Sequence, residues 1–520
     1  MQHNVGLILE KRAFLTPNLP ALYDVATGIR LTYAELNQRA NQAANAFLSL
    51  GIKKGDRVGL LLMNGQEFVE SIFGLAKIGA ITVPLNWRLL ADELEFILND
   101  CGVSLLVFDS DFCQTVEKLH AKPTGVKTWL QVRAHNNELS FAKNYEQLVQ
   151  PAIDVSPATN TYDDDDLFIM YTSGTTGLPK GVVHTHDTAM WSTITSSASI
   201  DMRIRDRFLV ILPLFHIGAL NPTMTCIKKG AALIIARNFD PASVWRLIND
   251  EEITTMLAVP AMLNFMRQAY DSQAVDHAQL RYCLVGAAPV AESLIKHYQQ
   301  LGICLIQVYG LTESCGPGCV LDEHEALQHI GSTGKAYFHT EVKIIKDDGE
   351  TAAPNESGEI LIRGRHIMKE YWNNPEATAL TLRNGWLYTG DVGSMDAEGF
   401  VTIKDRIKDM IISGGENVYP AEVENVLLSH PAVLEAAIIG KSHPKWGETP
   451  LAIVVKKSED LAETDIIAFC KAKLASYKCP TDVVFIEALP RNPSGKILKR
   501  VLREQLISTP ASEETEMDPA

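Results

Sequence analysis

The chain has 520 residues, 46% of them hydrophobic and 21% charged, which are ordinary values for a globular protein of two to four domains. Its 47 basic and 63 acidic residues give a net charge of −16, which argues against sequence-independent binding of nucleic acid and against a polybasic membrane patch. The longest apolar run, residues 208–215, is too short for a transmembrane segment, and the first residues lack the apolar core of a signal peptide. Because the nine cysteines are also scattered and odd in number, we expect a cytoplasmic protein with reduced thiols.

Short apolar segments alternate with helical patterns over the first part of the chain. Strands are expected at 57–63, 104–109, 167–172, 208–214, 231–236, 254–259, 282–286 and 304–309. Helical spacing is found at 67–79, 91–101, 241–251 and 290–300. This order predicts a large N-terminal region of doubly wound α/β sheets, with parallel strands covered on both faces.

The composition of the sequence changes near residue 334. Aspartate and glycine turns dominate residues 334–407, so we predict a small β subdomain there, at the end of an N-terminal domain of residues 1–407. Strands and helices over residues 408–505 predict a separate, small α+β domain. The polar, acidic residues 506–520 predict a disordered tail.

The densest chemical signal is the segment Tyr171-Thr-Ser-Gly-Thr-Thr-Gly-Leu-Pro-Lys180-Gly181, which follows a predicted strand. Backbone N–H groups, hydroxyls and an ammonium are the groups that bind phosphate oxygens. The segment is not a Walker A loop, because two residues separate Gly177 from Lys180. A flexible surface loop is the plain alternative, but the density of donors favours a phosphate-binding loop. Its contacts would come from Thr172, Ser173, Gly174, Thr175, Thr176, Gly177 and Lys180.

Further motifs follow in chain order. They are Pro213-Leu-Phe-His216, Gly286-Ala-Ala-Pro289, Tyr309-Gly-Leu-Thr-Glu313, Tyr388-Thr-Gly-Asp391, Lys404-Asp-Arg406-Ile-Lys408-Asp409, Ser413-Gly-Gly-Glu-Asn417 and Pro490-Arg-Asn-Pro-Ser-Gly-Lys496. Together with the phosphate loop they resemble the motifs of the adenylate-forming superfamily of acyl-CoA synthetases, luciferases and peptide-synthetase adenylation domains. The pattern is most similar to bacterial fatty acyl-CoA ligases.

The resemblance implies an ATP-dependent acid–CoA ligase that forms an acyl-adenylate and then an acyl-CoA thioester, with release of pyrophosphate and AMP. It implies ATP, Mg²⁺ and coenzyme A, together with a small carboxylic acid as substrate. Joining two anions requires neutralisation of charge and alignment of the reactants. Glu313 matches the family's Mg²⁺ ligand and Thr312 its phosphate contact. We interpret the acidic run 163–166 as a solvated segment rather than a metal cluster.

The nucleoside would be held by two further groups of residues. Asp391 matches the carboxylate that accepts hydrogen bonds from the ribose hydroxyls, and Arg406 matches its companion. A turn aspartate is the plain alternative for Asp391. The residues that flank the adenine by resemblance are Gly286, Ala287, Ala288, Pro289, Tyr309 and Gly310. For Tyr309 alone, a packed core tyrosine remains an alternative.

The resemblance also implies a C-terminal domain that moves between the half-reactions. Lys496 would enter the site for adenylation only, and Lys408 occupies the family's hinge. Rotation would then bring Gly414 and Gly415 to the path of the pantetheine arm. His216 resembles the gating residue between the acyl site and this path, with a satisfied buried histidine as the alternative. The catalytic set would be Lys180, His216, Thr312, Glu313 and Lys496.

The segment after Phe215 suggests which acid is used. It carries no charge before Lys228, whereas amino-acid activators place an aspartate there for the substrate ammonium. Apolar and small residues around it, and the glycines Gly310 and Gly316, are expected to leave room for an apolar tail. A medium- or long-chain fatty acid is therefore favoured, with an aryl acid such as a coumarate or a benzoate as the alternative.

Three other functions stay open at this point. They are an adenylating enzyme that loads a carrier protein, a luciferase-like oxygenase, and a nucleotide-binding relative without activity. The last is disfavoured because all the expected functional residues are present, namely Lys180, Thr312, Glu313, Asp391, Arg406 and Lys496. We expect no nucleic-acid partner and no transmembrane segment; weak peripheral membrane association and a homodimer stay open.

Overall fold

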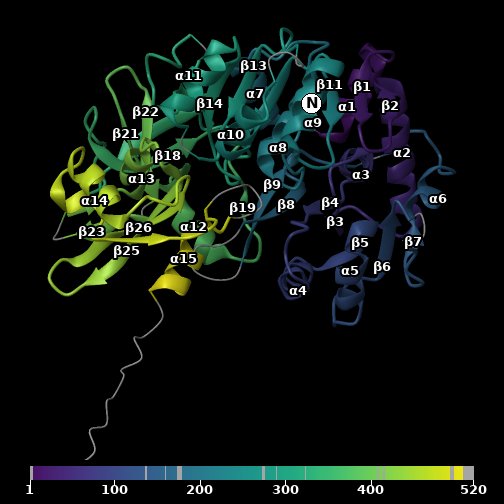
Figure 1. The fold of residues 1–520 in the computed structure, drawn as a ribbon. Coiled ribbons are helices and arrows are strands. Elements are labelled where there is room, and N and C mark those ends of the chain that lie inside the picture. The colour runs from purple at the N-terminus through teal and green to yellow at the C-terminus, as the bar shows by residue number, and fades with distance from the viewer. Residues whose placement is uncertain are drawn as a thin grey trace, which may run out of the picture. The chain divides into compact units, whose positions relative to one another are not determined.

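The computed structural model describes residues 4–134, 137–158, 160–172, 179–271, 276–288, 290–322, 324–406, 409–413, 416–491 and 497–507 (Figure 1). The chain divides into two compact units. The first comprises Met1–Glu356, Ile360–Thr389 and Met395–Thr402, and the second comprises Ser357–Glu359, Gly390–Ser394 and Ile403–Ala520. The predicted domain boundary at residue 408 stays a prediction, because Lys408 lies outside the described residues.

An eight-stranded sheet in the first unit carries both ends of the phosphate-loop segment. Its strands lie in the order β19 (Glu370–Tyr371), β9 (Lys180–Thr185), β8 (Asp166–Thr172), β4 (Ile81–Pro84), β3 (Arg57–Leu61), β5 (Val103–Asp109), β6 (Thr128–Val132) and β7 (Lys143–Asn144). The strands from β8 to β7 are parallel, as predicted, but β9 is antiparallel to both β8 and β19. The short connection from β8 to β9 explains this difference, because a parallel crossover needs about a dozen residues or more.

A nine-stranded sheet forms the other half of the first unit. Its strands lie in the order β16 (Lys335–Ala336), β15 (Cys319–Val320), β14 (Cys304–Tyr309), β13 (Tyr282–Val285), β12 (Thr255–Ala258), β10 (Arg207–Val210), β11 (Ala232–Ile235), β1 (Pro20–Asp24) and β2 (Ile29–Thr32). The strands from β14 to β1 are parallel, and β15, β16 and β2 add antiparallel edges. Because parallel strands end at the same edge, the segments after β13 and β14 share one edge of this sheet.

Helices of the first unit cover both sheets. They are α1 (Gly6–Leu15), α2 (Tyr33–Ser49), α3 (Gln66–Ile78), α4 (Ala91–Asp100), α5 (Cys113–His120), α6 (Tyr145–Val149), α7 (His186–Ser199), α8 (Ile217–Lys229), α9 (Pro241–Asp250), α10 (Pro260–Gln268), α11 (Glu292–Gln300) and α12 (Pro375–Thr381). Every residue of α3 is buried, because α3 packs in a core to which both sheets contribute side chains. Its last turn ends at Gly79, whose φ of 69° suits glycine.

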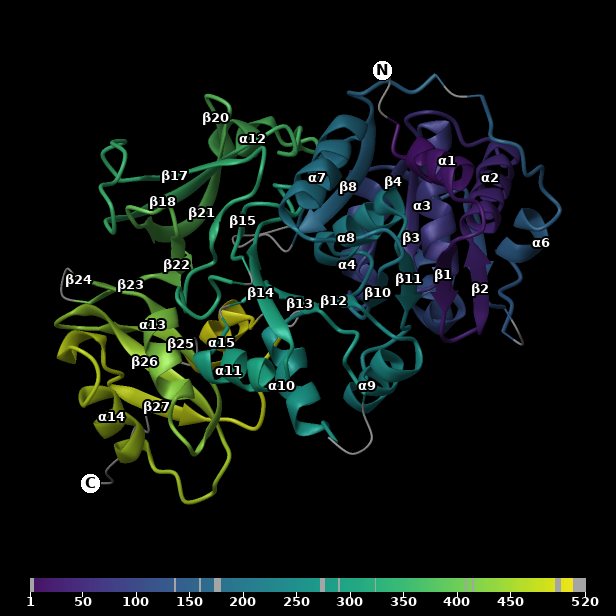
Figure 2. The ribbon, with the colours of Figure 1, turned by 90° about the horizontal axis from the view of Figure 1, so that it is seen from above.

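A smaller sheet contains the strands of the predicted β subdomain. It runs β17 (Glu341–Ile345), β18 (Ser357–Arg363), β21 (Trp386–Met395) and β20 (Leu382–Arg383), and β22 (Val401–Arg406) also pairs with β21. Figure 2 shows β17, β18 and β21 side by side. Residues of β18, β21 and β22 are divided between the two units.

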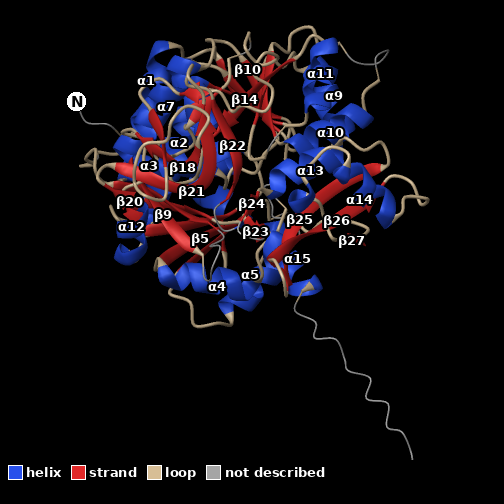
Figure 3. Ribbon diagram, turned by 90° about the vertical axis from the view of Figure 1, so that its left-hand side faces the viewer, coloured by secondary structure: helices blue, strands red, loops and turns tan. Residues whose placement is uncertain are grey.

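The second unit is built on a five-stranded sheet with helices on both faces. Its strands are β24 (Glu416–Val418), β23 (Ile411–Ser413), β26 (Gly447–Lys456), β25 (Val433–His443) and β27 (Asp482–Phe485). Alternate residues of β25 and β26 point to opposite faces, and each face has its own apolar core. The helices are α13 (Pro420–Leu428), α14 (Glu463–Lys471) and α15 (Lys499–Leu506) (Figure 3). The first two cover one face, and Leu502 of α15 packs on the other.

The α/β fold class predicted from the sequence is confirmed. Sequence patterns located most of the parallel strands and the helices α3, α4, α9 and α11 of the first unit, whereas the strands β1, β2, β6 and β7 and the other helices of that unit were not predicted. None of the helices within the described ranges combines the length and the apolar character that crossing a membrane requires.

Candidate active site

The β8–β9 hairpin fixes the two ends of the predicted phosphate loop. Thr172 at the end of β8 lies opposite Lys180 at the start of β9, and Tyr171 lies opposite Gly181. A Cβ at Gly181 would come within 2.7 Å of Ile169, so this close strand pairing requires glycine. The residues between the two ends, Ser173, Gly174, Thr175, Thr176 and Gly177, lie outside the described residues.

The segment after β14 carries the predicted metal ligand. Glu313 Oε1 accepts a hydrogen bond from the Tyr371 hydroxyl at 2.8 Å. The Lys180 ammonium lies 5.1 Å from the centre of the same tyrosine ring, a distance typical of a cation–π contact. Tyr371 thus connects Lys180, at the end of the predicted phosphate loop, with the carboxylate that ends the Tyr309–Glu313 motif. Sequence reasoning missed Tyr371, because a single tyrosine in a two-residue strand carries no motif signal.

The carboxylate oxygens of Glu313 are of the kind that Mg²⁺ prefers. Thr312, its half-buried neighbour, adds a hydroxyl to the same segment. The residues present would therefore fit a magnesium ion that is bound together with substrate phosphates. In the described part of the chain, no three His, Cys, Asp or Glu side chains are grouped so that they could hold a metal ion by themselves.

The residues predicted to flank adenine lie at the carboxyl edge of β13 and β14. Ala287 and Ala288 are exposed just after β13, and Tyr309 ends β14 as a buried side chain. Ala287 has a φ of 68°, which is uncommon for a residue with a Cβ and is typical of functional turns. A Cβ at Gly286 would meet the Val308 carbonyl oxygen at 2.7 Å, so glycine allows the two strand ends to approach each other. Pro289 lies outside the described residues.

The expectation that Gly310 and Gly316 leave room for an acyl tail is wrong for this conformation. A Cβ at Gly310 would lie 1.5 Å from the carbonyl oxygen of Gly316, and one at Gly316 would lie 3.3 Å from Asn221. The space beside both glycines is therefore filled by the protein itself. Their small size lets the segment after β14 fold back on itself.

His216 begins helix α8 as its N-cap residue. Burial and the neighbouring Arg88 guanidinium lower the pKa of His216 to about 4, so the imidazole is neutral at pH 7. Its Nε2 is buried without a hydrogen-bond partner among the described residues. The ring packs 4.4 Å from that of Phe215, which in turn lies 6.2 Å from Trp87. The alternative of a fully satisfied buried histidine is therefore disfavoured.

The second unit brings the two predicted ribose contacts together. The Arg406 Nε lies 3.0 Å from Asp391 Oδ1, and the Asp391 side chain is buried. Gly390, with a φ of 70°, precedes Asp391 and donates its N–H to Glu359 at 2.9 Å. A buried carboxylate on a strand, held by one arginine, suits a cis-diol better than a plain turn aspartate would. Lys408, Gly414, Gly415 and Lys496 lie outside the described residues.

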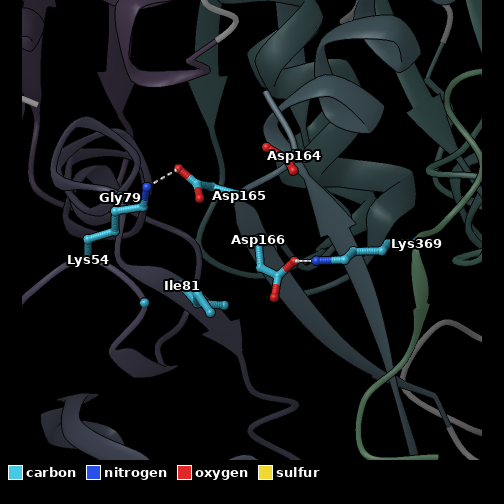
Figure 4. Close-up of a pocket in the computed structure, with 8 residues that line it drawn as sticks. Lys54, Gly79, Ile81, Asp164, Asp165, Asp166 and Lys369 are labelled. Carbon is cyan, nitrogen blue, oxygen red and sulfur yellow. Dashed lines mark hydrogen bonds and ion pairs between the residues drawn. The ribbon is translucent and has the colours of Figure 1, made fainter. Parts of the chain in front are cut away.

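The acidic run before β8 is ion-paired rather than simply solvated. Asp165 lies 2.7 Å from the Lys54 ammonium, and Asp166 lies 2.8 Å from that of Lys369. Figure 4 shows these side chains around a pocket of about 270 Å³, which Asp164 also lines. Two lysines thus neutralise Asp165 and Asp166, so the expected solvated run is ion-paired at these two residues.

Comparison with known proteins agrees with this arrangement. The model of the AMP-binding enzyme family matches residues 9–372, and that of the AMP-binding enzyme C-terminal domain matches residues 422–496. A long-chain-fatty-acid–CoA ligase of Mycobacterium tuberculosis (FadD13) is 45% identical over 509 residues, which are 97% of this chain and 99% of that protein. A feruloyl-CoA synthase of Amycolatopsis sp is 38% identical over 499 residues, or 95% of this chain and 97% of that protein.

The solved structures give the same result. The o-succinylbenzoate CoA synthetase (MenE) from Bacillus subtilis, in complex with the acyl-adenylate intermediate OSB-AMP, matches with a TM-score of 0.86 and 34% identity. The match covers 97% of this chain and 98% of that one. The matches to both family models and the relationship over nearly the whole length place this chain in the AMP-binding enzyme family.

Proposed function

We propose that the chain is an ATP-dependent acid–CoA ligase that acts on a medium- or long-chain fatty acid. The observation that carries the proposal is the contact of Tyr371 with both Glu313 and Lys180, in a chain related to CoA ligases over nearly its whole length. Lys180 provides a cation that can bind an anion, and Glu313 provides a carboxylate that can bind a metal ion, on either side of the same tyrosine. Both are needed where a carboxylate attacks a polyphosphate.

The reaction has two half-reactions. In the first, a carboxylate oxygen of the acid attacks the α-phosphorus of ATP, the bond from that phosphorus to the bridging oxygen breaks, and pyrophosphate leaves with the electron pair. In the second, the CoA sulfur, having lost its proton, attacks the acyl carbon, and AMP leaves with the electrons of the acyl–oxygen bond. No bond to the protein is required in either step.

The residues after β14 and on β9 would serve the first half-reaction. Lys180 would hold phosphate oxygens together with the hydroxyls and backbone of the loop that begins at Thr172. Thr312 would donate its hydroxyl to a phosphate, and Glu313 would hold Mg²⁺, which when bound neutralises phosphate charge. Lys496 would contribute a positive charge where the carboxylate meets the α-phosphate.

The residues after β13 and β14 would contact the adenine, and Asp391 would bind the ribose. The Asp391 carboxylate can accept hydrogen bonds from both ribose hydroxyls, while Arg406 fixes its orientation at 3.0 Å. For the second half-reaction, the neutral imidazole of His216 would separate the acyl group from the path of the thiol. Gly414 and Gly415 would line that path after rotation about the hinge at Lys408.

The wall formed by α8 supports an uncharged acid as the substrate. Ala219, Leu220 and Met224 are buried on this helix, which has no charged residue before Lys228. A substrate ammonium would therefore find no counter-ion here. The relationship to a feruloyl-CoA synthase supports an aryl acid as the alternative substrate, and loading of a carrier protein is the alternative for the second step.

Release of pyrophosphate from ATP·Mg²⁺ across a panel of acids tests the proposal. The panel is acetate, octanoate, palmitate, benzoate and 4-coumarate, each with and without CoA. We expect turnover that requires CoA and peaks with octanoate or palmitate. A peak with an aromatic acid would show that the substrate is an aryl acid. Turnover independent of CoA would favour the loading of a carrier protein. No release with any acid would contradict the ligase assignment.

Two finer aspects of the proposal concern partners. Phe14 and Leu15 at the end of α1 are 77% and 54% exposed, beside the Lys11 ammonium, which supports weak peripheral contact with an anionic membrane. Co-sedimentation with phosphatidylglycerol vesicles, compared between the wild type and Phe14→Ser, checks this contact.

A homodimer is the second proposed association, and light scattering after size-exclusion chromatography checks for it.

A further inference from the structure

The segment Thr312–Cys315, which follows β14, has an unusually complete set of hydrogen bonds to its backbone. All four of its consecutive carbonyl oxygens accept a hydrogen bond from a group outside the segment. The donors are His184 Nε2 to Thr312 at 2.7 Å, Met368 N to Glu313 at 2.8 Å, His366 Nδ1 to Ser314 at 2.8 Å, and Ser192 Oγ to Cys315 at 2.6 Å. The segment is thus fixed from β9, from α7 and from the connection between β18 and β19.

These hydrogen bonds hold a segment whose backbone is strained. Cys315 has a φ of 54°, in the left-handed region where residues with a Cβ are uncommon. Such a conformation costs of the order of 1 kcal/mol or more and persists only where the surroundings determine it. The Cys315 carbonyl accepts a second hydrogen bond from Asn221 Nδ2 at 3.2 Å. The shape of the segment therefore depends on its external donors.

His184 is one of these donors and lies fully buried in β9, four residues beyond Lys180. A carbonyl oxygen only accepts, so the hydrogen of the imidazole is on Nε2, which points at Thr312. Its Nδ1 lies 3.3 Å from the Thr188 hydroxyl. Burial lowers the pKa of His184 to about 4, which keeps the ring neutral at pH 7.

His366 has the opposite arrangement. Its Nδ1 donates to the Ser314 carbonyl, so its Nε2 accepts the hydrogen bond from the Thr340 hydroxyl at 2.8 Å. The side chain is also fully buried, and burial lowers the pKa of His366 to about 4. The two histidines thus hold the carbonyls on either side of Glu313, each through a different ring nitrogen.

We propose that His184 and His366 are positioning residues for adenylation, which hold the Thr312 hydroxyl and the Glu313 carboxylate where ATP and Mg²⁺ need them. This inference rests on the proposed function of Thr312 and Glu313. Neither histidine touches the reactants; each acts through a backbone carbonyl next to a group that does. Preorganised supporting groups of this kind keep a site within the narrow geometry that catalysis tolerates.

The two tautomers allow a crossed test with conservative variants. The amide nitrogen of glutamine can reach the place of a histidine Nε2, and that of asparagine the place of Nδ1. His184→Gln and His366→Asn therefore keep a donor to the segment, whereas His184→Asn and His366→Gln do not. A role in packing alone would not produce opposite preferences at the two positions.

The readouts are pyrophosphate release as a function of ATP and Mg²⁺, and thioester formation from supplied acyl-adenylate. We expect His184→Asn and His366→Gln to weaken adenylation by about 10- to 100-fold and to raise the Mg²⁺ requirement, with the donor-keeping variants within about threefold of the wild type. Thioester formation should change far less. Urea unfolding of each variant separates loss of positioning from loss of folding.

His186→Asn is the matched control, because His186 is equally buried but its Nδ1 faces the Val5 N–H instead of the segment. Its requirement for Mg²⁺ should equal that of the wild type. Equal adenylation by all four test variants would overturn the inference while leaving the ligase intact. An inactive wild type would overturn the proposed function instead, and calorimetric binding of ATP·Mg²⁺ to the same variants would then decide the inference.

Discussion

The hydroxyl of Tyr371 donates to Oε1 of Glu313 at 2.8 Å, while its ring lies 5.1 Å from the ammonium of Lys180. One side chain therefore contacts the proposed metal ligand with its polar end and the proposed phosphate ligand with its face. The contact arises from strand pairing, because Tyr371 on β19 lies opposite Val182 on β9, two residues beyond Lys180.

The variant Tyr371→Phe separates these two contacts. It removes the hydrogen bond to Glu313 and keeps the ring beside Lys180. We therefore expect the Mg²⁺ concentration that pyrophosphate release requires to rise by about tenfold. Tyr371→Leu removes both contacts and should be more severe. Tyr162→Phe is the control, because Tyr162 is an exposed tyrosine that lies beside a different lysine, Lys54. Identical kinetics for Tyr371→Phe and the wild type would show that the hydroxyl is irrelevant.

Asp391→Asn tests the ribose contact. The amide keeps the shape of the carboxylate but weakens hydrogen bonds from the ribose hydroxyls, which are worth about 1.5–3 kcal/mol when one partner is charged. We expect the KM for ATP to rise by about tenfold or more, with little change in the KM for the acid. Asp482 is an aspartate of the same unit that pairs with Lys441, and Asp482→Asn should leave both constants unchanged. A change in the acid KM alone would contradict the assignment.

Stability should fall as the pH is lowered, and His186 contributes to this fall. Burial lowers the pKa of His186 to about 4, despite the opposing charge of Asp165, from about 6.5 in the unfolded chain. Between these values the unfolded chain binds more protons, so the free energy of unfolding drops by up to about 1.4 kcal/mol per pH unit as the pH falls.

His186→Asn checks this contribution. Its side-chain oxygen can still accept from the Val5 N–H, but it takes up no proton. Urea unfolding between about pH 7 and pH 5 should therefore give a flatter dependence than the wild type shows. Parallel curves for the two proteins would mean that His186 does not take up a proton on unfolding.

Gly310→Ala and Gly218→Ala should have opposite effects on folding. A Cβ at Gly310 overlaps the Gly316 carbonyl at 1.5 Å, a clash with backbone that no rotamer relieves, so we expect a loss of about 3 kcal/mol in the free energy of unfolding. A Cβ at Gly218 in α8 meets only Leu212, at 4.0 Å, and alanine favours the helix by about 0.5–1 kcal/mol. Denaturant titrations measure both effects, and a stable Gly310→Ala protein would show that the segment folds differently.

Lys496→Ala should separate the half-reactions. If this lysine meets the carboxylate and the α-phosphate, its removal should reduce adenylation by about 100-fold or more and spare thioester formation from supplied acyl-adenylate. Two coupled assays, for pyrophosphate and for free thiol, measure the steps separately. An equal loss in both would argue against a lysine that acts in the first step only.

The sequence pattern was sufficient to predict most of the buried parallel strands, but it did not predict the strands at the edges of the sheets. Strands such as β11 and β13 read as continuous apolar runs because both faces are covered. Helix α1 was missed because its apolar residues do not follow its buried face: Phe14 and Leu15 are exposed while Ile8 and Leu9 are buried. The direction of β9 depends on the hairpin and could not be read from its own residues.

Some residues of the candidate site could be predicted from the sequence and others could not. Lys180 and Glu313 stand in long motifs, so their roles could be proposed from the sequence. Tyr371, His184 and His366 could not be found, because their partners are a side chain and two backbone carbonyls that only the tertiary structure brings near. The misjudged glycine, Gly310, has the same cause, since sequence does not reveal what lies beside a missing side chain.

The pairing of β9 on both edges constrains evolution of the phosphate loop in one respect. Its register is set by β8 on one side, with Thr172 opposite Lys180, and by β19 on the other, with Tyr371 opposite Val182. With the register held from both sides, a slip of β9 by one residue is disfavoured, because it would turn every side chain of the strand to the other face of the sheet. A change in the length of the segment between Thr172 and Lys180 would therefore have to be taken up within that segment, without moving β9.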